Sequence, residues 1–158
     1  MILSIFSCNS KSQSVESPIY RVTLKTLLSH SVPESSVTNV NLEQVPYILD
    51  TREKNEYEVS SIEGARFVGY NEFDIDRVSD IPKDANILLY CSVGYRSEKI
   101  AEKMQESGWK NVSNLYGGIF EWKNQGKPVV DSTGMETSRV HAFDKTWGRF
   151  LKKGEKVY

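Results

Sequence analysis

The sequence predicts an α/β fold, with a parallel sheet flanked by helices in a single domain. Short apolar runs that suit buried strands alternate with segments of helical periodicity, and this alternation is typical of parallel sheets. The strongest predicted strand, residues 87–90, leads through a short loop into the strongest predicted helix, residues 97–107. The chain of 158 residues shows no internal repeat, so we expect one copy of the domain.

The weaker elements come first along the chain. Residues 19–24 alternate weakly between apolar and polar, which predicts a short strand. Leucines over 24–28 predict a short helix directly after it, with Thr23 as its N-cap. Residues 31–45 have no clear period and are expected to form a loop.

Clearer patterns begin at residue 47. Residues 47–49 are a compact apolar run, which predicts a buried strand that ends at Asp50. The highly charged residues 51–59 suit a short exposed helix or turn. A second short strand is expected over 65–68, followed by a short helix over 71–81.

The second half of the domain carries the strongest patterns. The helix predicted over 97–107 ends before Gly108, a residue type that favours helix ends. Its inner face is formed by Ile100, Ala101 and Met104. A last strand is expected over 112–115, and a helix that runs through Trp122 follows it. The domain is therefore expected to span residues 18–130.

Residues 131–158 differ in character and are interpreted as a C-terminal extension. Phe143, Trp147, Phe150 and Leu151 recur at the spacing of one helix face. This spacing predicts a helix that packs on the domain, with a basic side in solvent. Contact with an anionic lipid head group or a partner is the alternative interpretation.

The first residues raise a question of processing. A short apolar stretch ends at Ser7-Cys8, and the serine-rich residues 9–17 follow it as a polar tether. This resembles the end of a bacterial lipoprotein signal, in which Cys8 would accept the lipid and tether the protein to a membrane. The stretch lacks a basic region and is short for a signal. A location in the bacterial cell envelope and a cytoplasmic one with a frayed N-terminus therefore both remain open.

Composition narrows the possible functions. The formal net charge is -1, so no nucleic-acid partner is indicated. The two cysteines, Cys8 and Cys91, belong to no CxxC motif or Cys/His cluster, so no metal site is expected. Nothing in the sequence indicates the oligomeric state.

Cys91 has the setting of a reactive cysteine. It follows a predicted buried strand and precedes a helix, which places it at the carboxyl end of a parallel sheet, where ligands bind in such folds. The unpaired amides and partial positive charge of the helix start favour a thiolate, which is the nucleophilic form. Gly94 permits a tight turn, and Arg96 adds a cation nearby. We therefore expect Cys91 to be catalytic.

Two reaction classes use a cysteine in such a loop. Cysteine phosphatases and arsenate reductases attack an oxyanion, whereas sulfurtransferases hold a sulfane sulfur as a persulfide. Phosphatases carry Cys-x5-Arg, while Cys91 and Arg96 are separated by four residues. The tighter loop favours one terminal sulfur atom over a phosphoryl group.

Four segments resemble the single-domain rhodanese-like (thiosulfate sulfurtransferase-like) proteins. Residues 91–97 (CSVGYRS) are similar to the family's CxxGxRS loop. Residues 50–57 resemble its D-x-R-x-x-x-E-[FY] segment, and residues 62–65 resemble its I-x-G-A turn. Residues 115–122 resemble its L-x-G-G-x-x-x-W segment. The four matches occur in family order over about residues 45–130, so the resemblance covers the core of the expected domain.

The resemblance implies a rhodanese-type sulfurtransferase. Cys91 would take a sulfane sulfur from a small donor and pass it from a persulfide to a thiol or another thiophilic acceptor, without a cofactor. Asp50 and Arg52 would support the site, unless they form an ordinary surface ion pair. A noncatalytic rhodanese-like module that binds a partner is the alternative. The residues expected to bind the substrate are Ser92, Val93, Gly94, Tyr95 and Arg96.

Overall fold

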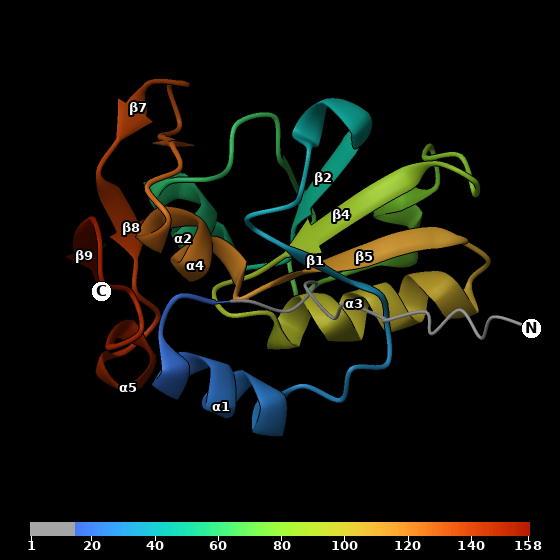
Figure 1. Cartoon of the computed structure of the whole chain (residues 1–158). Helices are drawn as coiled ribbons and strands as arrows, with labels where there is room; N and C mark the ends of the chain where they lie inside the picture. The colour runs from blue at the N-terminus through green and yellow to red at the C-terminus, as the bar shows by residue number, and fades with distance from the viewer. Residues whose placement is uncertain (1–14) are drawn as a thin grey trace, which may run out of the picture.

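The computed structural model describes residues 15–158 and confirms the α/β fold. A central five-stranded sheet has the order β1-β5-β4-β2-β3, and every pairing in it is parallel (Figure 1). Its strands are β1 (Glu34–Ser36), β2 (Tyr47–Asp50), β3 (Arg66–Phe67), β4 (Asn86–Tyr90) and β5 (Asn111–Tyr116). The predicted lipid-accepting residue Cys8 lies outside the described residues.

Five α-helices and two short 3-10 helices accompany the sheet in the described part of the chain. The α-helices are α1 (Pro18–Leu27), α2 (Lys54–Val59), α3 (Tyr95–Glu106), α4 (Gly118–Asn124) and α5 (Lys145–Gly148). The 3-10 helices are η1 (Leu42–Gln44) and η2 (Ile75–Val78). None of the helices within residues 15–158 has the length and apolar character needed to cross a membrane.

Strand β4 divides the core into two layers, because successive side chains of a strand point to opposite faces. Ile87 and Leu89 belong to the cluster that includes the inner face of α3. Leu88 and Tyr90 belong to the other cluster, which includes buried residues of α1, α4 and the C-terminal extension. The sheet is therefore covered on both faces, as parallel sheets require.

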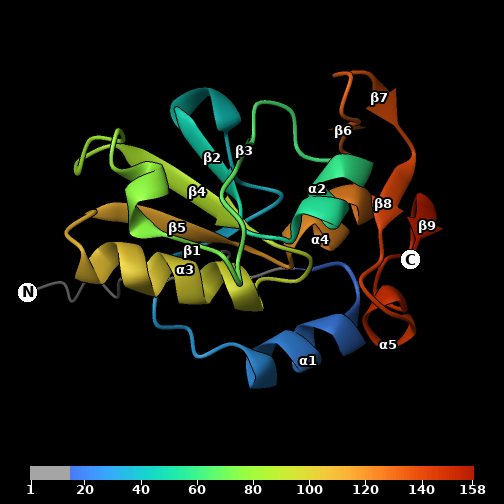
Figure 2. The same ribbon diagram turned by 180° about the vertical axis from the view of Figure 1, so that it is seen from behind.

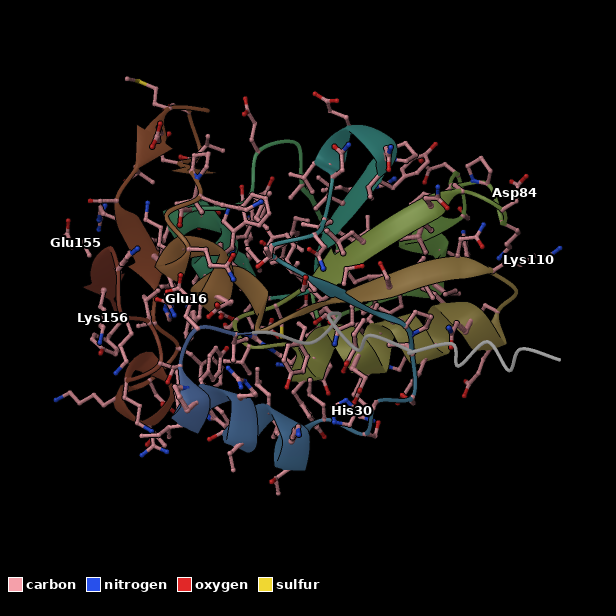
Figure 3. The ribbon with its side chains drawn as sticks, viewed as in Figure 1. Glu16, His30, Asp84, Lys110, Glu155 and Lys156 are labelled. Carbon is pink, nitrogen blue, oxygen red and sulfur yellow. The ribbon has the colours of Figure 1, made fainter. Side chains whose placement is uncertain are left out.

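The C-terminal extension lies at one end of the sheet. It contains the antiparallel pair β6 (Val129–Val130) and β7 (Glu136–Thr137), and the parallel pair β8 (Arg139–His141) and β9 (Glu155–Val157). Figure 2 shows β6, β7 and β8 beside α2 and α4, and α5 beside α1. In Figure 3, Asp84 and Lys110, which precede β4 and β5, lie at the opposite end of the molecule from Glu155 and Lys156. The carboxyl ends of the strands therefore face the extension.

The expectations for the N-terminal region were wrong in two places. Residues 19–24 form part of helix α1, not a strand, because Ser17 caps the amide of Tyr20 and a proline occupies the first helical turn. Thr23 is inside this helix and donates a hydrogen bond to the Ile19 carbonyl. The loop expected over 31–45 contains strand β1, which pairs with β5 at the sheet edge. This strand is short and polar, so it lacks an apolar pattern.

The C-terminal helix is much shorter than the apolar spacing suggested. α5 spans only four residues, and Phe143 lies before it with a φ of 66°. A left-handed residue interrupts a helix, so Phe143 and Phe150 cannot share one helical face. Phe150 and Leu151 nevertheless join the core, and Phe143 is left 46% exposed.

Candidate active site

Cys91 follows β4 directly and lies at the floor of a small pocket. The side chain is 1% exposed, yet it contributes to the wall of a pocket of about 130 Å³. The backbone amide of Gly94 donates a hydrogen bond to its Sγ at 3.1 Å. Gly94 has a φ of 122°, a conformation that glycine adopts without strain, and it turns this amide back toward the sulfur. The thiol therefore has an amide donor and an opening.

Helix α3 starts immediately after this turn. It has twelve residues, so its dipole is well developed at Tyr95. The first amides of a helix have no acceptor within the helix, which leaves them available to an anion at its start. Tyr95 itself is 40% exposed and lies at the pocket mouth, as does the more buried Val93. The start of α3 thus lines the pocket with donors and with one aromatic ring.

The first turn of α4, which follows its N-cap Gly117, holds the cysteine loop in place. The amide of Ile119 donates to the Cys91 carbonyl at 2.9 Å, and the amide of Phe120 donates to the Ser92 carbonyl at 3.2 Å. A Cβ atom at Gly118 would lie 2.4 Å from the Cys91 carbonyl oxygen. Only glycine allows this approach, so the Gly117-Gly118 pair fixes the position of the loop.

Asn114 supports the loop from β5 and was not singled out from the sequence. Its Nδ2 donates to the Gly94 carbonyl at 2.9 Å, and its Oδ1 accepts from Ser97 Oγ at 2.6 Å. A polar residue in the middle of a strand is the only sign of this role in the sequence. Its buried side chain holds both the turn and the first turn of α3.

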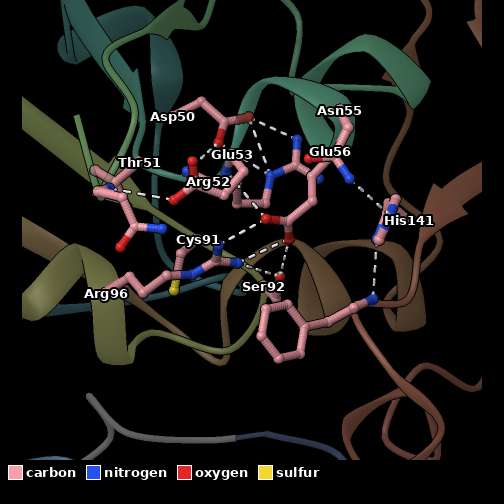
Figure 4. A network of polar contacts seen from close by, with 12 residues as sticks. Asp50, Thr51, Arg52, Glu53, Asn55, Glu56, Cys91, Ser92, Arg96 and His141 are labelled. Atoms are coloured by element: carbon pink, nitrogen blue, oxygen red, sulfur yellow. Dashed lines mark hydrogen bonds and ion pairs between the residues drawn. The ribbon is translucent and has the colours of Figure 1, made fainter. Parts of the chain in front are cut away.

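Glu56 is the second residue that sequence reasoning missed as a site residue, although it lies within one of the four matched segments. Its carboxylate accepts hydrogen bonds from Arg96 Nη1 at 2.6 Å and Nη2 at 2.8 Å (Figure 4). Ser92 Oγ donates to the same carboxylate at 3.0 Å and accepts from Arg96 at 2.9 Å. The segment 51–59 is therefore not fully exposed as expected, because Glu56 is buried in this network.

These contacts change the electrostatics expected around Cys91. Burial alone would lower the pKa of Arg96, but its hydrogen bonds to Glu56 and its electrostatic interaction with Cys91 raise it. Burial alone would raise the pKa of Glu56, but its hydrogen bonds and ion pair with Arg96 lower it. Both groups are therefore charged at neutral pH. Arg96 lies beside the thiol as expected, but its charge is compensated.

Asp50 and Arg52 form a buried ion pair, so the surface alternative is wrong for them. Arg52 Nη2 lies 2.6 Å from Asp50 Oδ2, and both side chains are 0% exposed. Tyr90 donates to the same Asp50 oxygen at 2.6 Å, and Arg52 donates to the Ser60 carbonyl. Burial lowers the pKa of Arg52, and the contacts with Asp50 outweigh this and raise it. Neither residue lines the pocket.

The two histidines have other partners. His30 pairs with Glu34 at 2.8 Å, far along the chain from the loop. His141 Nδ1 accepts from the Phe143 amide at 3.1 Å, and its other ring nitrogen contacts Asn55 (Figure 4). Within residues 15–158, no group of three or more His, Cys, Asp or Glu side chains could hold a metal ion.

The comparison with family models decides the identity of the fold. Residues 36–125 match the model of the rhodanese-like domain, and this segment is more than half of the chain. The chain belongs to the rhodanese-like family. The resemblance seen in the four sequence segments is thereby confirmed. The matched segment contains Cys91, Arg96, Glu56 and Asn114.

Curated relatives of this rhodanese-like chain include proteins of sulfur metabolism. A sulfurtransferase from Allochromatium vinosum is 40% identical over 58 residues, which are 37% of this chain and 54% of that protein. A putative sulfur carrier protein from Bacillus subtilis is 32% identical over 96 residues, 58% of this chain and 51% of that protein. A tRNA uridine(34) hydroxylase from Pectobacterium atrosepticum is 38% identical over 85 residues, but these are 24% of its length. The chain therefore spans about half, or less, of these relatives.

Solved structures agree with the fold. The rhodanese-like domain of an Anabaena protein superposes with a TM-score of 0.58 at 27% identity, covering 63% of this chain and 79% of that one. A Helicobacter pylori protein superposes with a TM-score of 0.53 at 29% identity, covering 62% and 89%. Each superposition therefore includes less than two thirds of this rhodanese-like chain.

Three residues of the pocket wall lie outside the segment that matches the rhodanese-like family. Leu27 comes from α1, while Phe143 and Trp147 come from the C-terminal extension. The remaining pocket residues are Cys91, Ser92, Val93, Tyr95 and Arg96. The family segment thus supplies the thiol and its loop, and the two ends of the chain complete the mouth of the pocket.

Proposed function

We propose that the protein is a rhodanese-type sulfurtransferase in which Cys91 is the nucleophile. The observation that carries this proposal is the hydrogen bond from the Gly94 amide to Cys91 Sγ at 3.1 Å, at the floor of an open pocket. An amide donor and a helix start beside a sulfur atom are suited to hold a negatively charged sulfur there. The sulfurtransferase and sulfur-carrier relatives support the same chemistry.

The first step loads sulfur onto the enzyme. The Cys91 thiolate attacks the sulfane sulfur of a donor, and a new S–S bond forms between Sγ and that sulfur. The bond between the sulfane sulfur and the rest of the donor breaks, and the leaving group departs with the electron pair, for example sulfite from thiosulfate. The product is a Cys91 persulfide anion. No proton moves in this step, so no general base is needed.

The second step returns the enzyme to its starting state. The thiolate of an acceptor attacks the terminal sulfur of the persulfide, and the S–S bond to Cys91 breaks with its electrons going to Sγ. Amides of residues 92–96 are suited to hold the terminal sulfur between the two steps, because their loop turns around Cys91. Ser92 and Arg96 are held by Glu56 and keep the loop in this shape.

Sulfur loading provides the test. The purified chain is incubated separately with thiosulfate, sodium methanethiosulfonate and glutathione persulfide, and its intact mass is then measured. We expect a gain of one sulfur with at least one donor, lost on treatment with a thiol acceptor and absent in Cys91→Ser. If none of the donors adds sulfur to the folded protein, the proposal is wrong.

The competing functions give different results in the same preparation. A cysteine phosphatase would hydrolyse an aryl phosphate and take up no sulfur, and a binding module would do neither.

Arg96→Ala tests whether Arg96 helps to shape the loop around Cys91. We expect it to slow loading, because Ser92 and Glu56 lose a partner, while circular dichroism shows a retained fold. Unchanged loading would show that Arg96 has no part in shaping the loop.

A further inference from the structure

The mouth of the pocket above Cys91 is mainly apolar. Leu27, Phe143 and Trp147 line it together with Val93 and Tyr95. Arg96 is the only charged residue among the pocket-lining residues, and Glu56 already accepts hydrogen bonds from both of its terminal nitrogens. The pocket therefore offers apolar surface and backbone amides, but no uncompensated cation among its lining side chains.

Phe143 adds to this character. Its ring centroid lies 5.1 Å from the guanidinium carbon of Arg96, in the range of a cation–π contact. The ring thus gives the pocket an apolar surface, and it also covers one side of the guanidinium. The backbone of Phe143 is held by its hydrogen bond to His141 at 3.1 Å, which places the ring without help from a helix.

The other walls are anchored to the core. Trp147 packs against Phe150 with ring centroids 5.9 Å apart, and Phe150 stacks on Tyr20 of α1 at 4.7 Å. Tyr20 in turn donates to the Gly117 carbonyl at 2.8 Å, in the turn that clamps the cysteine loop. The extension and α1 are therefore joined to each other and to the loop, so the mouth is formed before any ligand arrives.

We propose that this mouth selects sulfane-sulfur donors that carry an apolar, ring-sized group, with Leu27, Phe143 and Trp147 as specificity-determining residues. The inference rests on the proposed sulfurtransferase function. An apolar cavity of about 150 Å³ can hold benzene, and the pocket here has about 130 Å³. Inorganic thiosulfate has two negative charges and no apolar group, so it gains nothing from these walls.

An aryl thiosulfonate is a donor with the required chemistry. The Cys91 thiolate attacks its terminal sulfur, the S–S bond to the sulfonyl sulfur breaks, and the aryl sulfinate leaves with the electron pair. The thiolate and the thiosulfonate each carry one negative charge, and so do the persulfide and the sulfinate. The step therefore balances without another reactant. The aryl ring would contact Phe143 and Trp147 while the terminal sulfur meets Sγ.

The test compares sodium benzenethiosulfonate with sodium methanethiosulfonate and thiosulfate. Rates of sulfur loading on Cys91 are measured by intact mass, and each is divided by the rate of the same donor with free cysteine, which removes intrinsic reactivity. We expect the wild type to prefer the benzene compound over both others. Phe143→Ala should reduce the preference over methanethiosulfonate by about 2- to 10-fold, the range expected for losing one aromatic contact.

Control variants distinguish the loss of a pocket contact from a general effect of mutation on the protein. Phe143→Tyr should retain the preference, and Leu27→Ala should weaken it. Met135→Ala and Val22→Ala should leave it unchanged, because these side chains are exposed and lie outside the pocket. Equal corrected rates for the three donors, or a preference that survives Phe143→Ala and Leu27→Ala, would overturn the inference while leaving the sulfurtransferase intact. Absence of loading by every donor would instead overturn the function itself.

Discussion

The carboxylate of Glu56 accepts two hydrogen bonds from the guanidinium of Arg96, although the two residues are 40 positions apart in the chain. Glu56 lies in α2 and Arg96 in the first turn of α3. The pair therefore ties a helix of the first half of the domain to the loop that carries Cys91. Its side chains are 2% and 12% exposed, so solvent screens the interaction little.

Glu56→Gln is expected to destabilise the protein at neutral pH. Breaking one partner of a buried pair costs about 3–5 kcal/mol in the free energy of unfolding. The pKa of Glu56 is lowered from its ordinary value of 4.5, so its stabilising effect is complete above that pH and is lost as the pH falls through the folded value. Urea unfolding at pH 7 and over an acidic series measures the difference between wild type and variant, which should shrink toward low pH.

The control for this prediction lies on the same helix. Glu58 is 57% exposed and has only a 3.7 Å contact with Lys54, so Glu58→Gln should change the unfolding free energy by about 0–1 kcal/mol. A wild-type to Glu56→Gln difference that stays constant at acidic pH would contradict the ionised pair.

Gly118→Ala is expected to displace the cysteine loop. A Cβ there would meet the Cys91 carbonyl oxygen at 2.4 Å and the Ser92 carbonyl oxygen at 2.5 Å. Gly134→Ala is the matched control, because Gly134 also has a positive φ, of 81°, but its Cβ would meet nothing within 4 Å. Thermal unfolding should show Gly118→Ala to be less stable than the control by about 1–3 kcal/mol. Equal stabilities would mean that the loop moves aside at no cost.

Asp50→Asn is expected to cost about 3–5 kcal/mol in unfolding free energy, because it leaves Arg52 charged and buried without its counter-ion. The comparison is Asp80→Asn, which breaks a solvent-exposed pair with Arg66 and should change the unfolding free energy far less than Asp50→Asn. Urea unfolding of the two variants checks the contrast. Similar small losses would indicate that Arg52 finds another partner when Asp50 is neutral.

Asn114→Asp is expected to loosen the turn at Gly94 selectively. The carboxylate still accepts from Ser97 Oγ but cannot donate to the Gly94 carbonyl. Sulfur loading of Cys91 should slow, and unfolding free energy should fall by about 1–3 kcal/mol for the unsatisfied buried groups. Asn111→Ala, in the same strand but exposed, serves as the control. Loading at the wild-type rate would show that the Gly94 turn holds without Asn114.

The sequence predicted β4, the loop at Cys91 and α3 well, because the structure that each segment favours on its own is the one it adopts in the fold. The apolar run of β4, the loop at Cys91 and the periodicity of α3 each depend on neighbouring residues alone. The position of the thiol at the carboxyl end of the sheet follows from this strand–loop–helix order.

Other features depend on contacts that no local pattern records. β1 is a polar edge strand of three residues that exists through its pairing with β5. The role of Glu56 depends on Arg96 across the fold, and the role of Asn114 depends on the path of the loop. In the extension, the backbone turn at Phe143 interrupts an apolar spacing that suited a helix. The capping of α1 by Ser17 before a proline, by contrast, could have been recognised from the sequence.

The hydrogen bonds from α4 to the cysteine loop also provide a way to follow opening of the loop without any label. The amide protons of Ile119 and Phe120 are tied to the Cys91 and Ser92 carbonyls, so they can exchange with deuterated water only when these contacts open. Their exchange rates therefore report how often the cysteine loop separates from the first turn of α4. A persulfide or bound donor that steadies the turn would be seen as slower deuterium uptake at these two positions.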